Sequence, residues 1–266
     1  MSDEKEMSFL DHLESLRWHV LRAVASIFVF GVVAFIYKDF FLGKIVLGMT
    51  KPDFLTYRLL CQLSEATCID KLNFKLISIT MTGQFMMHMT YSIVTGFILS
   101  FPYVFWEIWR FIKPALHDIE QSAANGAVFF VSLLFAIGVV FGYYMVAPLA
   151  VNFLVNYQLD PSIENQIDIA SYVSTVVMLV LACGLMFQLP VAVYVLSKIG
   201  LLTPTIMRTY RRHAIMTILI VSAFITPSPD VISQLLVALP VYFLYEGSVF
   251  ISAYVWKKQT AVLNSF

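Results

Sequence analysis

The stretch FPYVFWEIWRFIKPALHDIE, residues 101–120, decides how this chain is interpreted. A long apolar run ends within it in aromatic residues and a proline, and acidic residues follow. Aromatic side chains are common where a helix leaves a membrane, so this order places the carboxylate of Glu120 just outside a bilayer. A cationic ligand could reach an acid in that position. The stretch therefore favours a membrane receptor.

The composition of the whole chain also indicates a membrane protein. Of its 266 residues, 59% are apolar and 13% are charged, which is more apolar than soluble domains are. The 17 basic and 17 acidic side chains cancel, so the chain as a whole has no charge with which to attract nucleic acid. We therefore expect an all-α, polytopic membrane protein that does not bind nucleic acid.

The apolar runs give the expected membrane spans. A helix needs about 20 apolar residues to cross the hydrocarbon core of a bilayer. The run at 215–225 has about half that length, and it is equally typical of a buried or re-entrant segment. The longer runs that meet the requirement are 18–37, 85–106, 127–149, 169–196 and 231–256.

The basic residues decide between five and six crossings. Six crossings from an inside N-terminus keep Lys257 and Lys258 in the cytoplasm, whereas five would place them outside, against the tendency of basic residues to stay inside. The long outer segment at about 38–76 is an exception, and long translocated loops follow this rule poorly. We therefore predict six transmembrane helices with both termini cytoplasmic. The predicted divisions are an amino-terminal segment at 1–17, one membrane domain at 18–256 and a tail at 257–266.

The cysteines leave two interpretations open. Cys61 and Cys68 lie in the long outer segment, where an oxidising compartment could join them. The alternative is that both are small apolar residues packed in a loop helix, as we expect for Cys183 inside the fourth long run.

The sequence contains no recognisable catalytic or metal-binding pattern. The chain has no nucleotide-binding glycine loop, no paired-histidine zinc motif and no glycine-flanked serine of the hydrolase type. Its histidines occur singly, and a lone histidine in a helical membrane protein is more often a hydrogen-bonded structural residue than a proton carrier. We expect no metal, no cofactor and no enzyme activity.

A small secondary transporter is the main alternative to a receptor. Such a protein also has several spans, prolines inside helices and isolated polar residues at membrane depth. The absence of an internal repeat counts against it. The acids also lie at the cytoplasmic ends of the expected spans rather than at their midpoints.

Three stretches together resemble one family, the TatC subunit of the twin-arginine protein translocase. The first, FLDHLESLRWHV at 9–20, is similar to the family's amino-terminal His-Leu-x-Glu-Leu-Arg element, and the second is the stretch at 101–120. The third is FITPSPDVISQ at 224–234, preceded in the expected order by DIASY at 168–172 and FQLP at 187–190. Their order and their membrane sides make the combined match specific over nearly the whole chain.

The resemblance implies a receptor in the bacterial cytoplasmic (inner) membrane that binds signal peptides carrying two consecutive arginines on folded cargo. It also implies small single-span partner subunits of the TatA and TatB type, contact with membrane lipid and an oligomeric assembly. Arginine presents a planar fork that a carboxylate can meet with two parallel hydrogen bonds, which agrees with acids beside the membrane. The implied ligand-binding residues are Asp11, Glu14, Arg17, Phe111 and Glu120.

The chain departs from the family pattern at two positions. The family's amino-terminal glutamate falls on Ser15, and Glu14 is one residue earlier, which rotates its carboxylate by about 100° on a helix. Either Glu14 or Asp11 would then take that role. Gln188 stands where the family often has a membrane-embedded glutamate, two residues before Pro190. Glutamine does not titrate, and near Pro190 its amide could serve a carbonyl that the proline frees, so we expect Gln188 to line a polar concavity without handling protons.

The remaining candidates have structural interpretations beside functional ones. Pro114 and Pro190 are expected to shape turns or helix breaks. Asp230 is expected to cap the following helix by accepting hydrogen bonds from backbone N–H groups. Glu246 matches a family acid in the last span, and Glu107 lies near the end of the second. Each acid either acts in function or pairs with a neighbouring helix.

Overall fold

The computed structural model describes residues 9–51, 53–63, 75–112, 124–157, 160, 165–226 and 231–263. The chain is mostly helical, and several of its helices are long. The α-helices are α1 (Phe9–Ile36), α2 (Leu55–Leu63), α3 (Gly83–Ile112), α5 (Ala124–Phe141), α6 (Ala147–Asn156), α7 (Ile169–Met186), α8 (Leu189–Lys198), α9 (Pro204–Thr209), α10 (Arg211–Ile225) and α11 (Val231–Leu263). The other elements are the π-helices η1 (Asp39–Val46) and η5 (Gly142–Val146), the 3₁₀-helix η2 (Leu47–Thr50) and the strands β1 (Lys75–Ile77) and β2 (Gln166–Asp168).

Five helical segments of the described chain are long and apolar enough to cross a membrane, which agrees with the expected polytopic helical membrane protein. They are Glu14–Ile36, Gly83–Phe111, Val128–Asn156, Ile169–Lys198 and Gln234–Lys257. The short sixth run lies in α10, which has 15 residues, fewer than the roughly 20 that a crossing usually takes. A sixth crossing by α10 remains a prediction.

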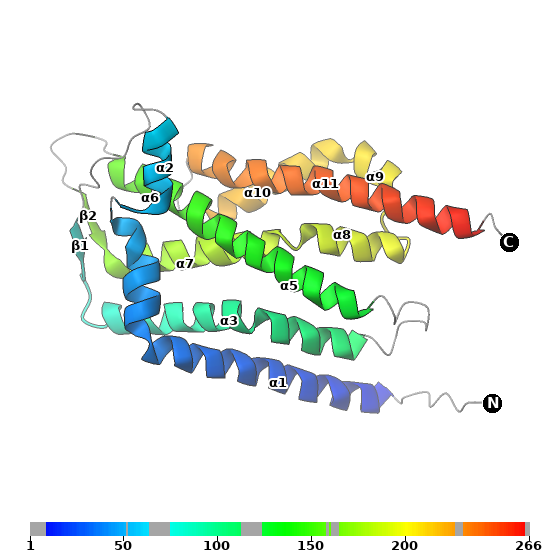
Figure 1. Cartoon of the computed structure of the whole chain (residues 1–266), viewed down its shortest axis with the longest axis horizontal. Coiled ribbons are helices and arrows are strands. Elements are labelled where there is room, and N and C mark those ends of the chain that lie inside the picture. Colours follow the sequence, from blue (N-terminus) through cyan, green and yellow to red (C-terminus); the bar gives the residue numbers. More distant parts are fainter. Residues whose placement is uncertain are drawn as a thin grey trace.

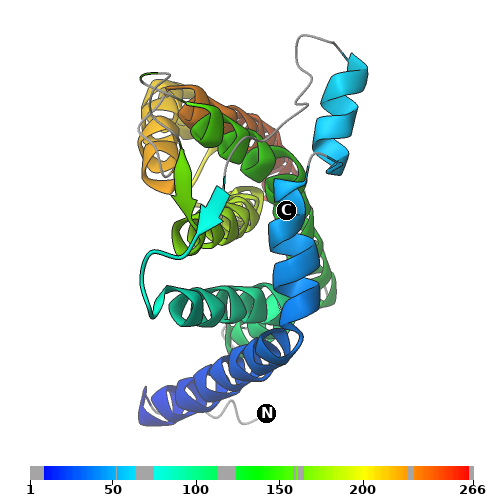
Figure 2. The ribbon, with the colours of Figure 1, turned by 90° about the vertical axis from the view of Figure 1, so that its left-hand side faces the viewer.

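The long helices lie roughly side by side (Figure 1). The start of α1, the end of α3 and the end of α11 lie at the same end of the bundle, called here the terminal end (Figure 1). The short elements α2, β1 and β2 lie at the opposite end, called the loop end (Figure 1). Figure 2 shows α1 and α3 paired along one side of the molecule, away from α10 and α11.

Glycines allow the helices to approach closely in two places. A Cβ atom built on Gly96 of α3 would lie 2.5 Å from the backbone nitrogen of Gly31 in α1, closer than real atoms come. The second place is between η5 and α7, where a Cβ on Gly142 of η5 would lie 2.8 Å from the Cβ of Cys183 in α7. Small residues at such crossings bring the helix backbones together, which is how helices gain packing energy inside lipid.

The third span is interrupted near its middle. The π-helix η5 separates α5 from α6, and Pro148 stands in the first turn of α6. A proline has no N–H to donate to the carbonyl four residues earlier, here that of Tyr144. The hydroxyl of Thr56, in α2 at the loop end, donates to that carbonyl instead. The break in the span therefore becomes the place where α2 attaches.

The predicted run at 169–196 is divided in the structure. The helices α7 and α8 are separated by Phe187 and Gln188, and Pro190 stands in the first turn of α8. This agrees with a structural role for Pro190, because a proline fits the first turn of a helix and disrupts its interior. The two helices together still form one candidate span.

The expectation of an all-α fold needs one correction at the loop end. Strands β1 and β2 form a parallel pair in which Leu76 lies opposite Ile167. Three-residue strands are too short to give a recognisable alternation in a sequence. Asp168, the last residue of β2, accepts hydrogen bonds from the backbone N–H groups of Ile79 and Ser171, so it joins β1 to the start of α7.

The two described cysteines differ in their chemical state. Cys61 is in α2 and is disulfide-bonded, and Cys183 is a buried free thiol in α7. Cys68 lies outside the described residues, so its pairing with Cys61 stays a prediction.

Candidate functional site

The predicted ligand-binding residues that the structure describes lie at the terminal end, on α1 and α3. Glu14 and Arg17 are exposed on the first turns of α1, three residues apart and thus on the same face of the helix. Neither forms an ion pair with another described residue. Both charges are therefore available to a ligand.

Phe111 lies at the end of α3 and reaches α1. Its ring is half-buried, and its centroid is 6.1 Å from that of the His19 imidazole, with the two planes tilted by 60°. One residue earlier, the Arg110 guanidinium lies 4.9 Å from the centre of the Trp106 ring, which is a cation–π contact within α3. The end of α3 thus holds an aromatic surface that already accommodates a guanidinium.

A buried acid stands directly behind these residues. The side chain of Glu107 is only 1% exposed, and its Oε2 atom lies 2.5 Å from Nδ1 of His19 on α1. The Tyr103 hydroxyl, one turn earlier on α3, donates to its Oε1 atom at 3.0 Å. Both carboxylate oxygens therefore have partners, as a buried charge requires. Of the two interpretations of Glu107, the structure shows the pairing with a neighbouring helix.

Sequence reasoning missed the role of His19. We treated the histidines as single structural residues, and His19 is 88 residues from Glu107. The signal that could have found the pair is the position of each residue near the cytoplasmic end of an expected span, because two polar residues at similar depth in adjacent helices tend to find each other.

Gln188 lies at the break between α7 and α8. Its amide Nε2 donates to the backbone carbonyl of Val131 in α5, at a long 3.4 Å. The amide thus points to the neighbouring helix and not to a carbonyl of its own span. A polar concavity lined by Gln188 stays a prediction.

Glu246 is paired as well. Its carboxylate accepts hydrogen bonds from Arg211 of α10 at 2.8 Å and from Tyr242 of α11 at 2.9 Å. This contact ties the start of α10 to α11. A further hydrogen bond joins α11 to α9, because the Tyr245 hydroxyl donates to the carbonyl of Met207 in α9 at 2.8 Å.

Several predicted residues are beyond what the structure describes. The backbone of Asp11 belongs to α1, but its side chain is not among the described ones. Pro114, Glu120 and Asp230 lie outside the described residues altogether. The roles predicted for these residues stay predictions.

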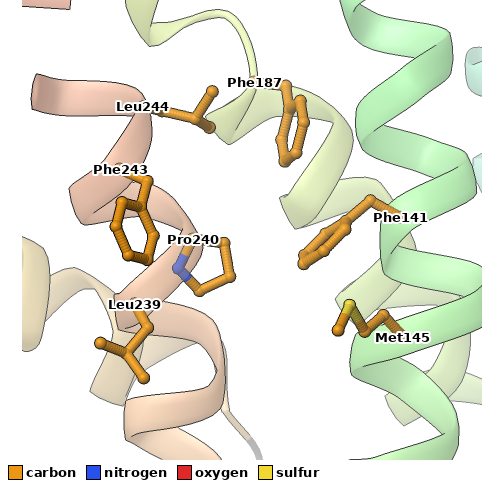
Figure 3. Close-up of a pocket in the computed structure, with 7 residues that line it drawn as sticks. All are labelled: Phe141, Met145, Phe187, Leu239, Pro240, Phe243 and Leu244. Atoms are coloured by element: carbon orange, nitrogen blue, oxygen red, sulfur yellow. The ribbon is translucent and has the colours of Figure 1, made fainter. Parts of the chain in front are cut away.

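A pocket of about 450 Å³ opens between α5, α11 and the break after α7. Figure 3 shows Phe187 and Phe141 facing Phe243 and Pro240 across it. Every lining side chain is apolar: Phe141, Met145, Phe187, Leu239, Pro240, Phe243 and Leu244. Without a polar side chain, this pocket offers an arginine no carboxylate and no side-chain hydrogen-bond acceptor. The described residues also contain no group of three or more side chains that could hold a metal ion.

The fold is similar to that of a solved membrane receptor. The structure described as "Crystal Structure of Twin Arginine Translocase Receptor- TatC" superposes with a TM-score of 0.73 and is 28% identical in sequence. The match covers 92% of this chain and 99% of that one.

Relatives in sequence carry the same description. The Sec-independent protein translocase protein TatC of Blattabacterium sp. subsp. Periplaneta americana is 35% identical over 267 residues, which cover 97% of this chain and all of the relative. The protein of that name from Campylobacter jejuni is 34% identical over 90% of this chain and 91% of its own length. The model of the family described as Sec-independent protein translocase protein (TatC) matches residues 11–240. This chain therefore belongs to the TatC family, the multi-pass membrane components of the Sec-independent, twin-arginine translocase.

Proposed function

We propose that the chain binds twin-arginine signal peptides at the terminal end of the bundle. The observation that carries the proposal is the grouping of Glu14 and Phe111 on two helices that the buried Glu107–His19 contact holds together. An exposed carboxylate and an aromatic ring at the ends of adjacent helices are the two groups that a guanidinium uses best. We include Asp11 and Glu120 in this site on the basis of the sequence.

We also propose that the terminal end faces the cytoplasm and that α10 is a sixth, short crossing. The proposal is supported by the position of the start of α1 and the end of α11 at the same end of the bundle, since an even number of crossings returns a chain to its starting side (Figure 1). Basic residues near the ends of the helices at this end support the cytoplasmic orientation. They include Arg17, Arg22, Arg110, Lys198, Arg208, Arg212 and Lys257.

The partners that we propose follow from the family. They are small single-span translocase subunits of the TatA and TatB type, membrane lipid and further copies of the assembly. Transport energy would come from outside this chain, since we assign it a binding role and no catalytic one.

Binding of a synthetic signal peptide to the chain in lipid nanodiscs tests the proposal. We expect the twin-arginine peptide to bind at least about tenfold more tightly than its twin-lysine variant, because lysine lacks the bidentate fork. Glu14→Gln and Glu120→Gln should each remove much of that difference.

The matched control is Glu246→Gln, which neutralises an acid that is already paired with Arg211 on another part of the bundle. It should leave the preference for arginine unchanged. Equal binding of both peptides to the unmodified chain would contradict the proposal, and uptake of a labelled solute by vesicles holding this chain alone would favour a transporter.

A further inference from the structure

The helix α1 depends on α3 for its position. Among the described elements, α3 is the one with which α1 makes extensive contact. Three kinds of contact join the two helices along their length. They are the polar contact of His19 with Glu107 at the terminal end and the approach of Gly31 to Gly96 in the middle. Near the loop end, two hydrogen bonds join the helices: that of His88 Nε2 with the Phe35 carbonyl at 3.1 Å, and that donated by the Tyr91 hydroxyl to the Ala34 carbonyl at 3.3 Å.

The contact at the terminal end differs from the other two because it contains a buried charge. His19 is 15% exposed and Glu107 is 1% exposed, and the Tyr103 hydroxyl occupies the second oxygen of the carboxylate. The positive charges of Arg22 and Arg110 lie close enough to interact electrostatically with this cluster. Removing one partner of a buried charge is far more disruptive than never having the charge, because the remaining group is left without hydrogen bonds. The cluster therefore favours one relative position of α1 and α3 strongly.

This cluster lies one to two helical turns from the proposed binding residues along both helices. Glu14 precedes His19 by five residues, which is about 7.5 Å along the axis of α1. Phe111 follows Glu107 by one turn of α3, and its ring contacts His19 itself. A shift of α1 along α3, or a rotation about its own axis, would therefore move the Glu14 carboxylate relative to the Phe111 ring.

We propose that His19, Tyr103 and Glu107 form a positioning cluster that sets the placement of Glu14 relative to Phe111 and thereby the affinity for the arginine pair. The inference rests on the proposed function. None of the three side chains needs to touch the ligand. The role of the cluster is to keep Glu14 and Phe111, which lie on different helices, at the separation that a guanidinium bridges. When that separation is lost, the affinity falls even though every binding residue remains.

Variants of His19 test the role of the cluster. His19→Leu removes the donor and leaves the Glu107 carboxylate buried with one partner, so affinity for the twin-arginine peptide should fall about tenfold. His19→Gln restores a side-chain N–H donor and should bring the affinity back to within about threefold of the unmodified chain. The double variant of His19→Leu with Glu107→Leu removes the charge along with its partner. It should unfold at a higher temperature than His19→Leu alone and still bind weakly.

The separation of the helices is the readout that distinguishes positioning from a general loss of stability. Spin labels on Leu16→Cys and Ile108→Cys, which replace side chains that are 37% and 46% exposed, report the distance between α1 and α3 at the terminal end. The distance distribution should broaden in His19→Leu and narrow again in His19→Gln. An unchanged distribution in His19→Leu would overturn the inference.

His88→Leu is the matched control, because it removes a histidine contact between the same two helices near the loop end. It should lower the thermal stability and leave both peptide affinity and the label distances unchanged. If His88→Leu and His19→Leu weaken binding equally, the cluster has no positioning role. If the unmodified chain binds arginine and lysine peptides alike, the proposed function fails first, and the label distances still decide whether the cluster fixes α1 on α3.

Discussion

At the scale of single residues, the polar side chains of the described helices tend to form hydrogen bonds with groups of a neighbouring helix. Thr56 illustrates this at the loop end, where its hydroxyl donates to the Tyr144 carbonyl. That carbonyl needs a partner because Pro148 has no N–H to offer it. The next residue of α2, Tyr57, donates to the Pro148 carbonyl itself at 3.4 Å. The attachment of α2 therefore depends on a defect in the helix that it touches.

The dependence of Thr56 on Pro148 can be measured. We expect Thr56→Val to lower the free energy of unfolding by about 1 kcal/mol, the usual net loss for one hydrogen bond. In a Pro148→Ala background the alanine N–H can donate to Tyr144, so the same substitution should cost clearly less. Chemical or thermal unfolding of the four proteins in one detergent gives the coupling. Equal costs of Thr56→Val in both backgrounds would show that the hydroxyl does not replace the missing donor.

At the scale of the helices, the pair of α1 and α3 rests on the contact of two glycines. A Cβ on Gly96 would lie within 3 Å of Gly31 backbone atoms and 2.8 Å from the Ile27 carbonyl oxygen. Because these neighbours are backbone atoms, they cannot rotate away as a flexible side chain would. Any larger residue must push the two helices apart.

Gly96→Ala should therefore destabilise the protein by about 1 to 3 kcal/mol, as overpacked cores usually do. Gly247→Ala in α11 is the control, because a Cβ there meets nothing within 4 Å. Alanine is the better helix former, so this control should be neutral or slightly stabilising. Unfolding temperatures of the two variants give the comparison, and a Gly96→Ala protein as stable as the control would mean that the helices are not in close contact.

How far the sequence predicted these elements depends on the range of the interactions that form them. The long helices follow from runs of apolar residues, and the break before α8 follows from Pro190, because both signals are local. The contact of His19 with Glu107 spans 88 residues, and Thr56 and Tyr144 are equally far apart in the chain. Such pairings depend on which helices become neighbours. A single sequence records the polar residues and leaves their partners open, as it did for Glu107 and Glu246.

At the scale of the whole molecule, the spans differ in length. The 15 residues of α10 extend about 22 Å at 1.5 Å per residue, whereas a typical hydrocarbon core is about 30 Å thick. The candidate spans beside it have 23 to 30 residues. If α10 crosses the membrane, as we propose, the bilayer must become thinner next to it or the flanking residues must reach outward. Local thinning would lower the barrier to a crossing cargo.

The mismatch predicts a preference for thin bilayers. In nanodiscs made from lipids of increasing chain length, the unfolding temperature should pass through a maximum at a thickness below that of an ordinary membrane. Single cysteines placed one at a time along residues 215–225 and along α11 report which positions are shielded from a water-soluble reagent. The shielded stretch should contain fewer residues in 215–225 than in α11. A stability that rises steadily with thickness would contradict the expected mismatch and would favour α10 as a buried or re-entrant segment.

The near-exclusive packing of α1 on α3 has a consequence for the order of assembly in the cell. All residues of this interface lie within the first 112 of the chain, so a ribosome can deliver the complete helical hairpin before α5 emerges from it. The proposed binding residues Glu14 and Phe111 are then both present on the nascent chain. The later helices add the rest of the bundle to a proposed binding face whose two halves are already in place.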